Sequence, residues 1–183
     1  MKHLVNLAIA AGVFIFTKTY AELISFNSIQ ISETNLLEQT LVIAFAIQWI
    51  AFVPAYILKT EKFYDLTGSL TYLSIFIYCL VATDSIGNLK FSNILVAGAV
   101  MIWAMRLGSF LFMRISKDGK DERFNSIKTS FSRFFMTWTL QGMWVFICSS
   151  AALVAITSPT GVIISNIFII GFVLFIFGFV IEV

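Results

Sequence analysis

The sequence predicts an all-α membrane protein, a polytopic bundle of about six transmembrane helices with both termini in the cytosol. Three observations support this fold class. The 183 residues are 59% hydrophobic and only 12% charged, with a mean hydropathy of +0.93, whereas a soluble domain is nearer a quarter charged. The apolar residues gather in six runs separated by polar segments. The basic residues are concentrated in alternate connecting segments, as expected for a chain that crosses a membrane repeatedly.

Each apolar run is close to the length of about 20 residues that spans a bilayer. The first resumes after a short polar interruption and continues to Ile24, which favours a retained helix over a cleaved signal peptide. Pro54 predicts a kink in the second run, which membrane helices tolerate. The polar segment 26–39 is predicted to be a loop. The runs cover residues 4–16, 41–58 (with an alternative start at 36), 66–82, 94–113, 134–156 and 162–181.

The loop charges predict the topology. With the N-terminus inside, only Lys18 and Lys90 fall in outer segments, and nine basic residues fall in inner ones. Cytosolic loops of membrane proteins carry this excess of Lys and Arg. The inner residues are Lys2, Lys59, Lys62, Arg114, Lys117, Lys120, Arg123, Lys128 and Arg133.

Composition also argues against several functions. A net charge of +2 without a long basic arm does not suit nucleic acid as a partner, which leaves the lipid bilayer and a hydrophobic small molecule. His3 is the only histidine, so no His-based metal site or catalytic triad is present. Cys79 and Cys148 lie in apolar runs and are predicted to be buried residues without a disulfide. One transmembrane domain, residues 1–183, is expected, in a bacterial inner membrane or an endoplasmic reticulum membrane.

A cationic stripe on the fourth run is the main candidate site. Helical spacing places Trp103, Arg106, Phe110, Arg114 and Lys117 on one face. Arg106 lies about two turns inside the apolar run, where a charge is costly unless it faces protein, water or an anion. The stripe therefore predicts an anion site, with phosphate as the natural ligand. The alternative is that Arg114 and Lys117 are ordinary inner-loop cations and that Arg106 extends to the interface.

Polar residues within the other runs add candidates. On the third run, Tyr72 shares a face with Asp65 and Ser69 and can donate a hydrogen bond to a ligand carbonyl. Gln48 and Gln141 are glutamines within the second and fifth runs. A glutamine within a membrane faces protein or ligand rather than lipid. Simple interhelical hydrogen bonds are an equally good interpretation of both glutamines.

Several short segments, taken in their order along the chain, resemble a known family. It is the steroid 5-alpha-reductase-like membrane proteins, in their branch of uncharacterised multipass members. The resemblance runs from about Gln48 to the end of the chain. It is carried by Lys62-Phe63-Tyr64-Asp65-Leu66-Thr67-Gly68, Trp103 with Arg106-Leu107-Gly108, Arg114 with Gly119, Asp121, Arg123 and Phe124, Leu140-Gln141-Gly142 with Trp144, and Gly178 with Glu182.

The resemblance implies a membrane-embedded reductase that binds NADPH from the cytosolic side and reduces the C=C bond of an enone. It implies that Arg106 and Arg114 lie near the cofactor and Gln141 near the same cavity, and the cationic stripe adds Lys117 to the expected cofactor-binding residues. Gln48 and Tyr72 are the expected catalytic residues that hold the substrate carbonyl. Enolate charge develops on that oxygen, so preorganised donors there lower the barrier.

Two departures from the family pattern qualify this expectation. Characterised steroid reductases carry a carboxylic acid on the second span, where this chain has Gln48 and Trp49, so a lipid-like enone is expected in place of a steroid. The family's remaining cofactor motifs follow the position of Glu182, so the sequence is expected to be an N-terminal fragment that is inactive alone. The alternatives are a lipid-modifying methyltransferase related to isoprenylcysteine methyltransferases and a non-enzymatic protein that clamps a lipid headgroup with Arg106.

Overall fold

The protein is an all-α bundle in a computed structural model that describes residues 1–31 and 33–182. Ser32, in the predicted loop, and Val183, at the end of the chain, lie outside the described residues. The described elements are α1 (Lys2–Ile24), β1 (Gln30–Ile31), β2 (Thr34–Asn35), α2 (Leu36–Ile57), α3 (Tyr64–Ser85), α4 (Phe91–Asp118), the 3-10 helix η1 (Glu122–Phe124), α5 (Phe131–Thr157) and α6 (Asn166–Glu182). Over these residues, α1 to α5 are long and apolar enough to cross a membrane, and α6 is a shorter apolar helix of 17 residues. The predicted fold class is therefore confirmed.

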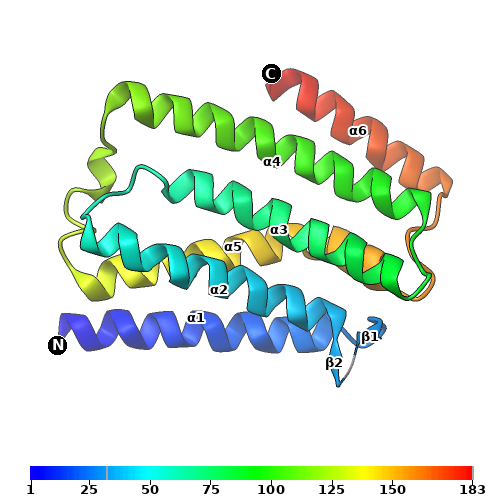
Figure 1. Ribbon diagram of the computed structural model, residues 1–183, viewed down its shortest axis with the longest axis horizontal. Coiled ribbons are helices and arrows are strands. Elements are labelled where there is room, and N and C mark those ends of the chain that lie inside the picture. The colour runs from blue at the N-terminus through cyan, green and yellow to red at the C-terminus, as the bar shows by residue number, and fades with distance from the viewer. Residues whose placement is uncertain (32, 183) are drawn as a thin grey trace.

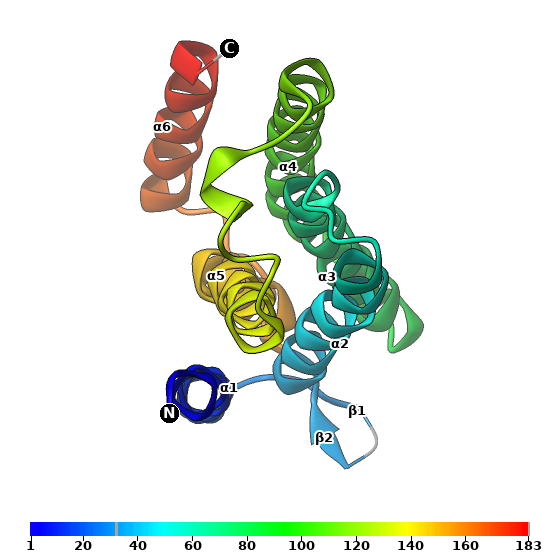
Figure 2. The ribbon, with the colours of Figure 1, turned by 90° about the vertical axis from the view of Figure 1, so that its left-hand side faces the viewer.

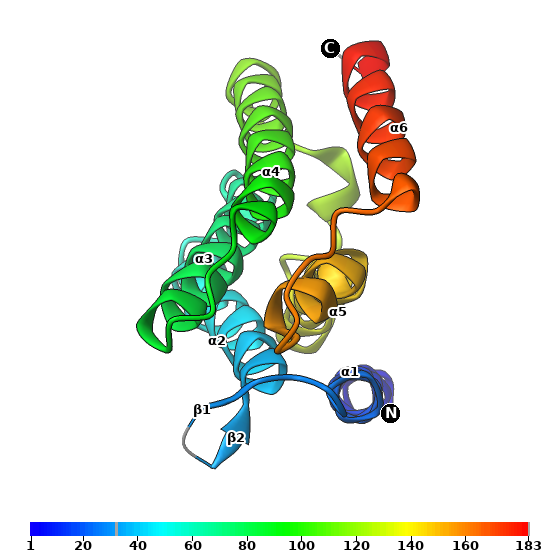
Figure 3. The same ribbon diagram turned by 90° about the vertical axis from the view of Figure 1, so that its right-hand side faces the viewer.

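Helices α2, α3 and α4 lie side by side in one row. Helix α5 lies on one side of this row, where it packs against α2 and α3 and also against α1 (Figures 2 and 3). The main core gathers around Phe45, Phe76 and Phe146, which are almost fully buried. A second cluster around Phe134 and Trp138 lies near the α4–α5 connection. The bundle is thus held by side chains from α2, α3 and α5.

Glycines bring the central helices close together. A Cβ atom at Gly108 of α4 would overlap the Ser69 Oγ of α3, and one at Gly68 would lie 2.7 Å from the Gln141 Nε2 of α5. Small residues at helix crossings are the usual means by which membrane helices pack, because lipid offers no hydrophobic driving force for their association. These contacts fix α3 between α4 and α5.

Helix α6 stands apart from this core. It has no buried residue, and Figure 3 shows it beside α4 at the end of an extended linker. The predicted helix from residue 162 begins four residues later, at Asn166. The reason is local, because Asn93 Oδ1 accepts the Val162 N–H and the Ser92 hydroxyl donates to the Val162 carbonyl. These bonds hold the linker against the start of α4 in a non-helical conformation.

The predicted loop 26–39 also differs from the structure. It contains a two-stranded antiparallel hairpin, with Gln30 opposite Asn35 and Ile31 opposite Thr34. Helix α2 begins at Leu36, which is the alternative start. Strands of two residues are too short to show the period-2 alternation by which a strand is recognised in a sequence.

The basic segments share one end of the bundle. Figure 1 places the N-terminus, the α2–α3 connection and the α4–α5 connection at one end, and the hairpin with the other two connections at the opposite end. The nine inner basic residues thus belong to one end of the molecule, as the topology prediction requires.

Candidate functional site

Arg106 projects from the middle of α4 toward α6. Its Nη1 lies 3.0 Å from Glu182 Oε1, and the Trp103 Nε1 donates to Glu182 Oε2 at 3.2 Å. The Arg106 side chain is only 25% exposed. A charge at this depth requires a protein or water partner, and here the partner is the carboxylate at the end of α6. The ion pair is also the main polar contact described between α6 and the bundle.

Tyr72 of α3 lies next to Trp103, on the side that faces the core of the bundle. Its ring packs edge-on against Trp103 with centroids 5.4 Å apart, and its side chain is almost fully buried. Within the described chain its hydroxyl has no hydrogen-bond partner, although the Cys148 thiol lies near it. We call Tyr72, Trp103, Arg106 and Glu182 the mid-membrane cluster. It combines a buried donor on α3, an aromatic wall on α4 and a partly exposed ion pair between α4 and α6.

A hollow of about 370 Å³ adjoins the mid-membrane cluster. It lies along α6 and is lined by Trp103 and Glu182 together with Leu174, Phe175, Gly178 and Phe179. Its walls are mainly apolar apart from the Glu182 carboxylate. A volume of this size lies within the roughly 300–1,000 Å³ of small-molecule sites.

Arg114 lies about two turns further along α4, near the basic end. Its Nη2 is 3.9 Å from Asp65 Oδ2 on α3, and its side chain is 44% exposed. At that distance the contact is electrostatic without a direct hydrogen bond. The guanidinium donors of Arg114 are therefore available, and a second hollow of about 340 Å³ is lined by Arg114, Ile115, Asp118, Lys120, Asp121, Glu122 and Arg123.

The walls of this second hollow are anchored by Glu61, from the α2–α3 connection. Glu61 Oε2 accepts from Lys128 Nζ at 2.7 Å, and Oε1 accepts the Asp121 N–H at 3.1 Å. Burial raises the pKa of the Glu61 carboxyl, but these hydrogen bonds outweigh burial and hold the pKa below its usual range. Asp121 in turn accepts from the Arg123 side chain, which lowers the Asp121 pKa.

Lys117 is exposed in the last turn of α4, where a cation also stabilises the carboxyl end of the helix. Helix α4 therefore presents Arg106, Arg114 and Lys117 along one side, as the stripe predicts.

Gln141 of α5 meets α3 from the opposite side. Its Nε2 donates to the Tyr64 carbonyl at 3.2 Å and contacts Gly68. Its Oε1 has no hydrogen-bond partner among the described residues. A hollow of about 320 Å³ is lined by residues that include Tyr64, Gln141 and Trp144. Gln141 thus combines the predicted interhelical hydrogen bond with a free acceptor.

Gln48 lies elsewhere in the bundle. It is fully buried between α2, α3 and α5, and its Nε2 donates to the Thr71 hydroxyl at 2.8 Å. Gly142 packs against its side chain. The bond to Thr71 is an interhelical hydrogen bond, although the Gln48 Oε1, like that of Gln141, has no partner among the described residues. The catalytic role of Gln48 stays a prediction.

Three residues of the site were not among the predicted site residues: Glu182, Asp65 and Glu61. The argument that singled out Arg106 applies equally to Glu182, a lone carboxylate after a long apolar run. No comparable signal marks Glu61, because acidic residues in a charged turn are ordinary. Among the residues that the structure describes, no three His, Cys, Asp or Glu side chains are grouped to hold a metal ion.

A comparison with known protein families identifies the family of the chain. The family described as protein of unknown function (DUF1295) matches residues 51–183. The chain belongs to the DUF1295 family. No curated protein and no solved structure matches it. The DUF1295 segment contains the mid-membrane cluster and, of the predicted site residues, Tyr72, Arg106, Arg114, Lys117 and Gln141, whereas Gln48 precedes it.

Proposed function

We propose that the protein is a membrane-embedded reductase of the steroid 5-alpha-reductase type, which uses NADPH to reduce the C=C bond of a lipid-like enone. One observation carries the proposal. The Tyr72 hydroxyl is a buried donor without a partner in the described chain, and the Tyr72 ring packs against Trp103, which shares the Glu182 carboxylate with Arg106. A buried polar group without a partner is costly, and a ligand carbonyl at this point would satisfy it.

The basic end of α4 supports a cofactor with phosphates. Arg114, Lys117 and Lys120 are exposed cations, and arginine binds phosphate oxygens through paired, charge-assisted hydrogen bonds. In the same hollow, Asp121 pairs with Arg123, and Asp118 and Glu122 also line the walls. The donors of Arg114, Lys117 and Lys120 would hold the phosphates of an anionic nucleotide at this end. When bound, NADPH would supply the hydride that reaches the β-carbon of the substrate.

Residues of the bundle would then bind the substrate and stabilise charge. Tyr72 donates a hydrogen bond to the enone carbonyl oxygen, on which negative charge develops as the hydride reaches the β-carbon. The α-carbon of the enolate then takes a proton that originates from water, which completes the reduction. Trp103 and the apolar wall of α6 exclude water from the reacting region. Of the two residues expected to act on the carbonyl, Tyr72 has the unused donor, whereas a Gln48 N–H already donates to Thr71.

Cofactor binding provides the first test. NADPH binding to the protein encoded by its complete gene, purified in detergent, is measured by energy transfer from tryptophan to the nicotinamide. The Arg114→Gln variant should bind about tenfold or more weakly, the effect of losing a hydrogen bond to a charged group. Arg133→Gln, which alters an exposed arginine of α5, should bind like the wild type. A folded wild-type protein that does not bind NADPH would exclude the reductase.

Tyr72→Phe provides the second test. Oxidation of NADPH is followed by the loss of its near-ultraviolet absorbance in the presence of long-chain α,β-unsaturated ketones. The variant should keep NADPH binding but lose turnover by roughly 10²–10³-fold, the usual effect of removing one oxyanion donor. Because it removes only a hydroxyl without a partner, its melting temperature should not fall. Unchanged turnover would remove Tyr72 from the reaction.

A further inference from the structure

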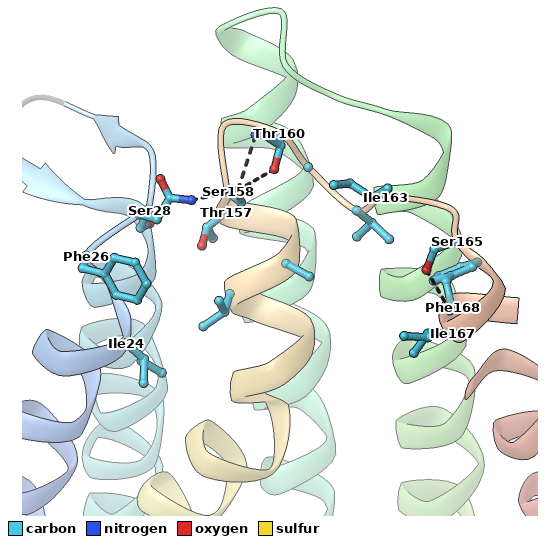
Figure 4. Close-up of a pocket in the computed structure, with 15 residues that line it drawn as sticks. Ile24, Phe26, Ser28, Thr157, Ser158, Thr160, Ile163, Ser165, Ile167 and Phe168 are labelled. Atoms are coloured by element: carbon cyan, nitrogen blue, oxygen red, sulfur yellow. Dashed lines mark hydrogen bonds between the residues drawn. The ribbon is translucent and has the colours of Figure 1, made fainter. Parts of the chain in front are cut away.

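A separate pocket lies at the hairpin end of the bundle, away from the basic end. Its volume is about 460 Å³, and it lies between the end of α1, the end of α5 and the linker to α6 (Figure 4). Apolar side chains form most of its walls, among them Ile24, Phe26, Val162 and Phe168. No charged residue is among the described side chains that line it. We call it the hairpin-end pocket.

Thr157 places an unused hydroxyl in this pocket. The residue has no exposed surface, and its Oγ1 has no hydrogen-bond partner among the described residues. Figure 4 shows the hydroxyl directed toward the side on which Ile24 and Phe26 lie. A threonine near the end of a helix ordinarily bonds back to a carbonyl of the preceding turn, so the free hydroxyl points to a missing acceptor.

The rim of the pocket differs from its interior. Ser158 and Thr160 bond to each other through their hydroxyl groups, and Asn27 reaches Ser158, so these polar groups are already engaged. The exposed Lys90 side chain donates to the Thr160 carbonyl and places an ammonium group beside the rim. From the interior outward, the site therefore offers an apolar cavity, one free hydroxyl donor and one cation.

We propose that the hairpin-end pocket binds one acyl chain of a membrane glycerophospholipid. The chain occupies the apolar cavity, the Thr157 hydroxyl donates to an ester carbonyl, and the Lys90 ammonium lies beside the phosphate. The order of apolar, hydrogen-bonding and charged groups in such a lipid matches the order in the pocket, and cations at a membrane surface attract lipid phosphates. The site is independent of the proposed reductase site and requires no NADPH.

Photocrosslinking with a defined lipid tests this assignment. The full-length protein is titrated in detergent with a phosphatidylglycerol that carries a diazirine in one acyl chain, and crosslinked peptides are identified by mass spectrometry. Saturable crosslinks should concentrate on residues 154–168 and 24–28. Thr157→Val should reduce them roughly fivefold, the effect of one hydrogen bond, and Thr157→Ser, which keeps the hydroxyl, should retain them. Lys90→Gln should also weaken them.

Thr83→Val is the matched control, because Thr83 is equally buried but its hydroxyl bonds to the Cys79 carbonyl of its own helix. It should leave the crosslinks unchanged. Crosslinks spread over all lipid-facing helices, or equal yields from Thr157→Val and the wild type, would overturn the proposal. Crosslinked dimers that protect the pocket in place of lipid would also overturn it, since a second copy would then be the occupant.

Discussion

At the scale of single residues, the ion pair of Arg106 and Glu182 is the least expected feature of the chain. Each charge alone would be costly in a bilayer core. Together they lie 3.0 Å apart, and Trp103 donates a further hydrogen bond to the carboxylate. Since α6 has no buried residue, its position beside α4 depends strongly on this pair.

A charge exchange tests that dependence. Arg106→Gln and Glu182→Gln should each lower stability by about 1–3 kcal/mol, above the value of a surface pair but below that of a fully buried one, because the pair is partly exposed. The double exchange of Arg106→Glu with Glu182→Arg should recover much of the loss. Thermal unfolding in detergent measures both. Equal losses in the singles and the exchanged double variant would show that the two charges do not interact.

At the scale of elements, close glycine contacts determine how α3 meets its neighbours. Gly108→Ala would place a methyl group against Ser69 Oγ, closer than the two atoms can approach, so α4 must move away from α3 and the bundle should lose about 1–3 kcal/mol. Gly98 of the same helix has open space around it. Gly98→Ala should therefore be neutral or stabilising by up to about 1 kcal/mol. Thermal unfolding of both variants gives the comparison, and equal effects would contradict the close contact.

The α4–α5 connection offers a prediction of pH dependence. Because the pKa of Glu61 is lowered in the folded protein, its contacts stabilise the connection at pH values above the ordinary glutamate pKa of about 4.3. That stabilisation is lost as the pH falls below this value and through the folded pKa. Hydrogen exchange at the Asp121 amide, corrected for the intrinsic rate, should therefore show weaker protection at acid pH than at neutral pH.

The control for this prediction is Glu61→Gln, which keeps an acceptor oxygen without the charge. It should show weak protection at both pH values. The Asp121 carboxyl titrates in the same direction because Arg123 lowers its pKa, so Asp121→Asn separates the two contributions. Unaltered acid sensitivity in Glu61→Gln would assign the effect to Asp121 instead.

At the scale of the whole molecule, the fold could be predicted because hydrophobic length and loop charge are properties of the sequence itself. Hydrophobic length matters because a chain that crosses lipid must form helices long enough to span it. Loop charge matters because it determines on which side of the membrane each connection lies. The hairpin could not be predicted because its two-residue strands are too short to show a period-2 pattern. The late start of α6 could not be predicted because it depends on side chains distant in sequence. Asn93 and Ser92 bind the Val162 backbone across 69 and 70 positions of the chain.

The candidate site could be predicted only in part, for a related reason. Helical spacing aligned Arg106 with Arg114, and the cost of a buried charge indicated that Arg106 has a partner. Spacing within one helix cannot identify a partner on another helix, so Glu182 and Asp65 were recognised as the partners of Arg106 and Arg114 only from the packing. Gln48 and Gln141 were equivalent in the sequence, and only the structure shows that Gln141 borders a hollow.

Topology gives the last prediction. Figure 1 places the α4–α5 connection at the end with nine basic residues and the α3–α4 connection at the other, and the positive-inside rule assigns the basic end to the cytosol. A cysteine introduced by Lys120→Cys should therefore react with a membrane-impermeant maleimide only from the cytosolic side of the membrane, and one from Asn88→Cys only from the opposite side. Cys79 is buried as predicted, whereas Cys148 is exposed on α5, contrary to the prediction, but lies within a membrane helix. Neither should therefore add to the signal. The opposite labelling pattern would place the proposed nucleotide end away from the cytosol and would contradict the proposed reductase, which binds NADPH from the cytosolic side, together with the topology.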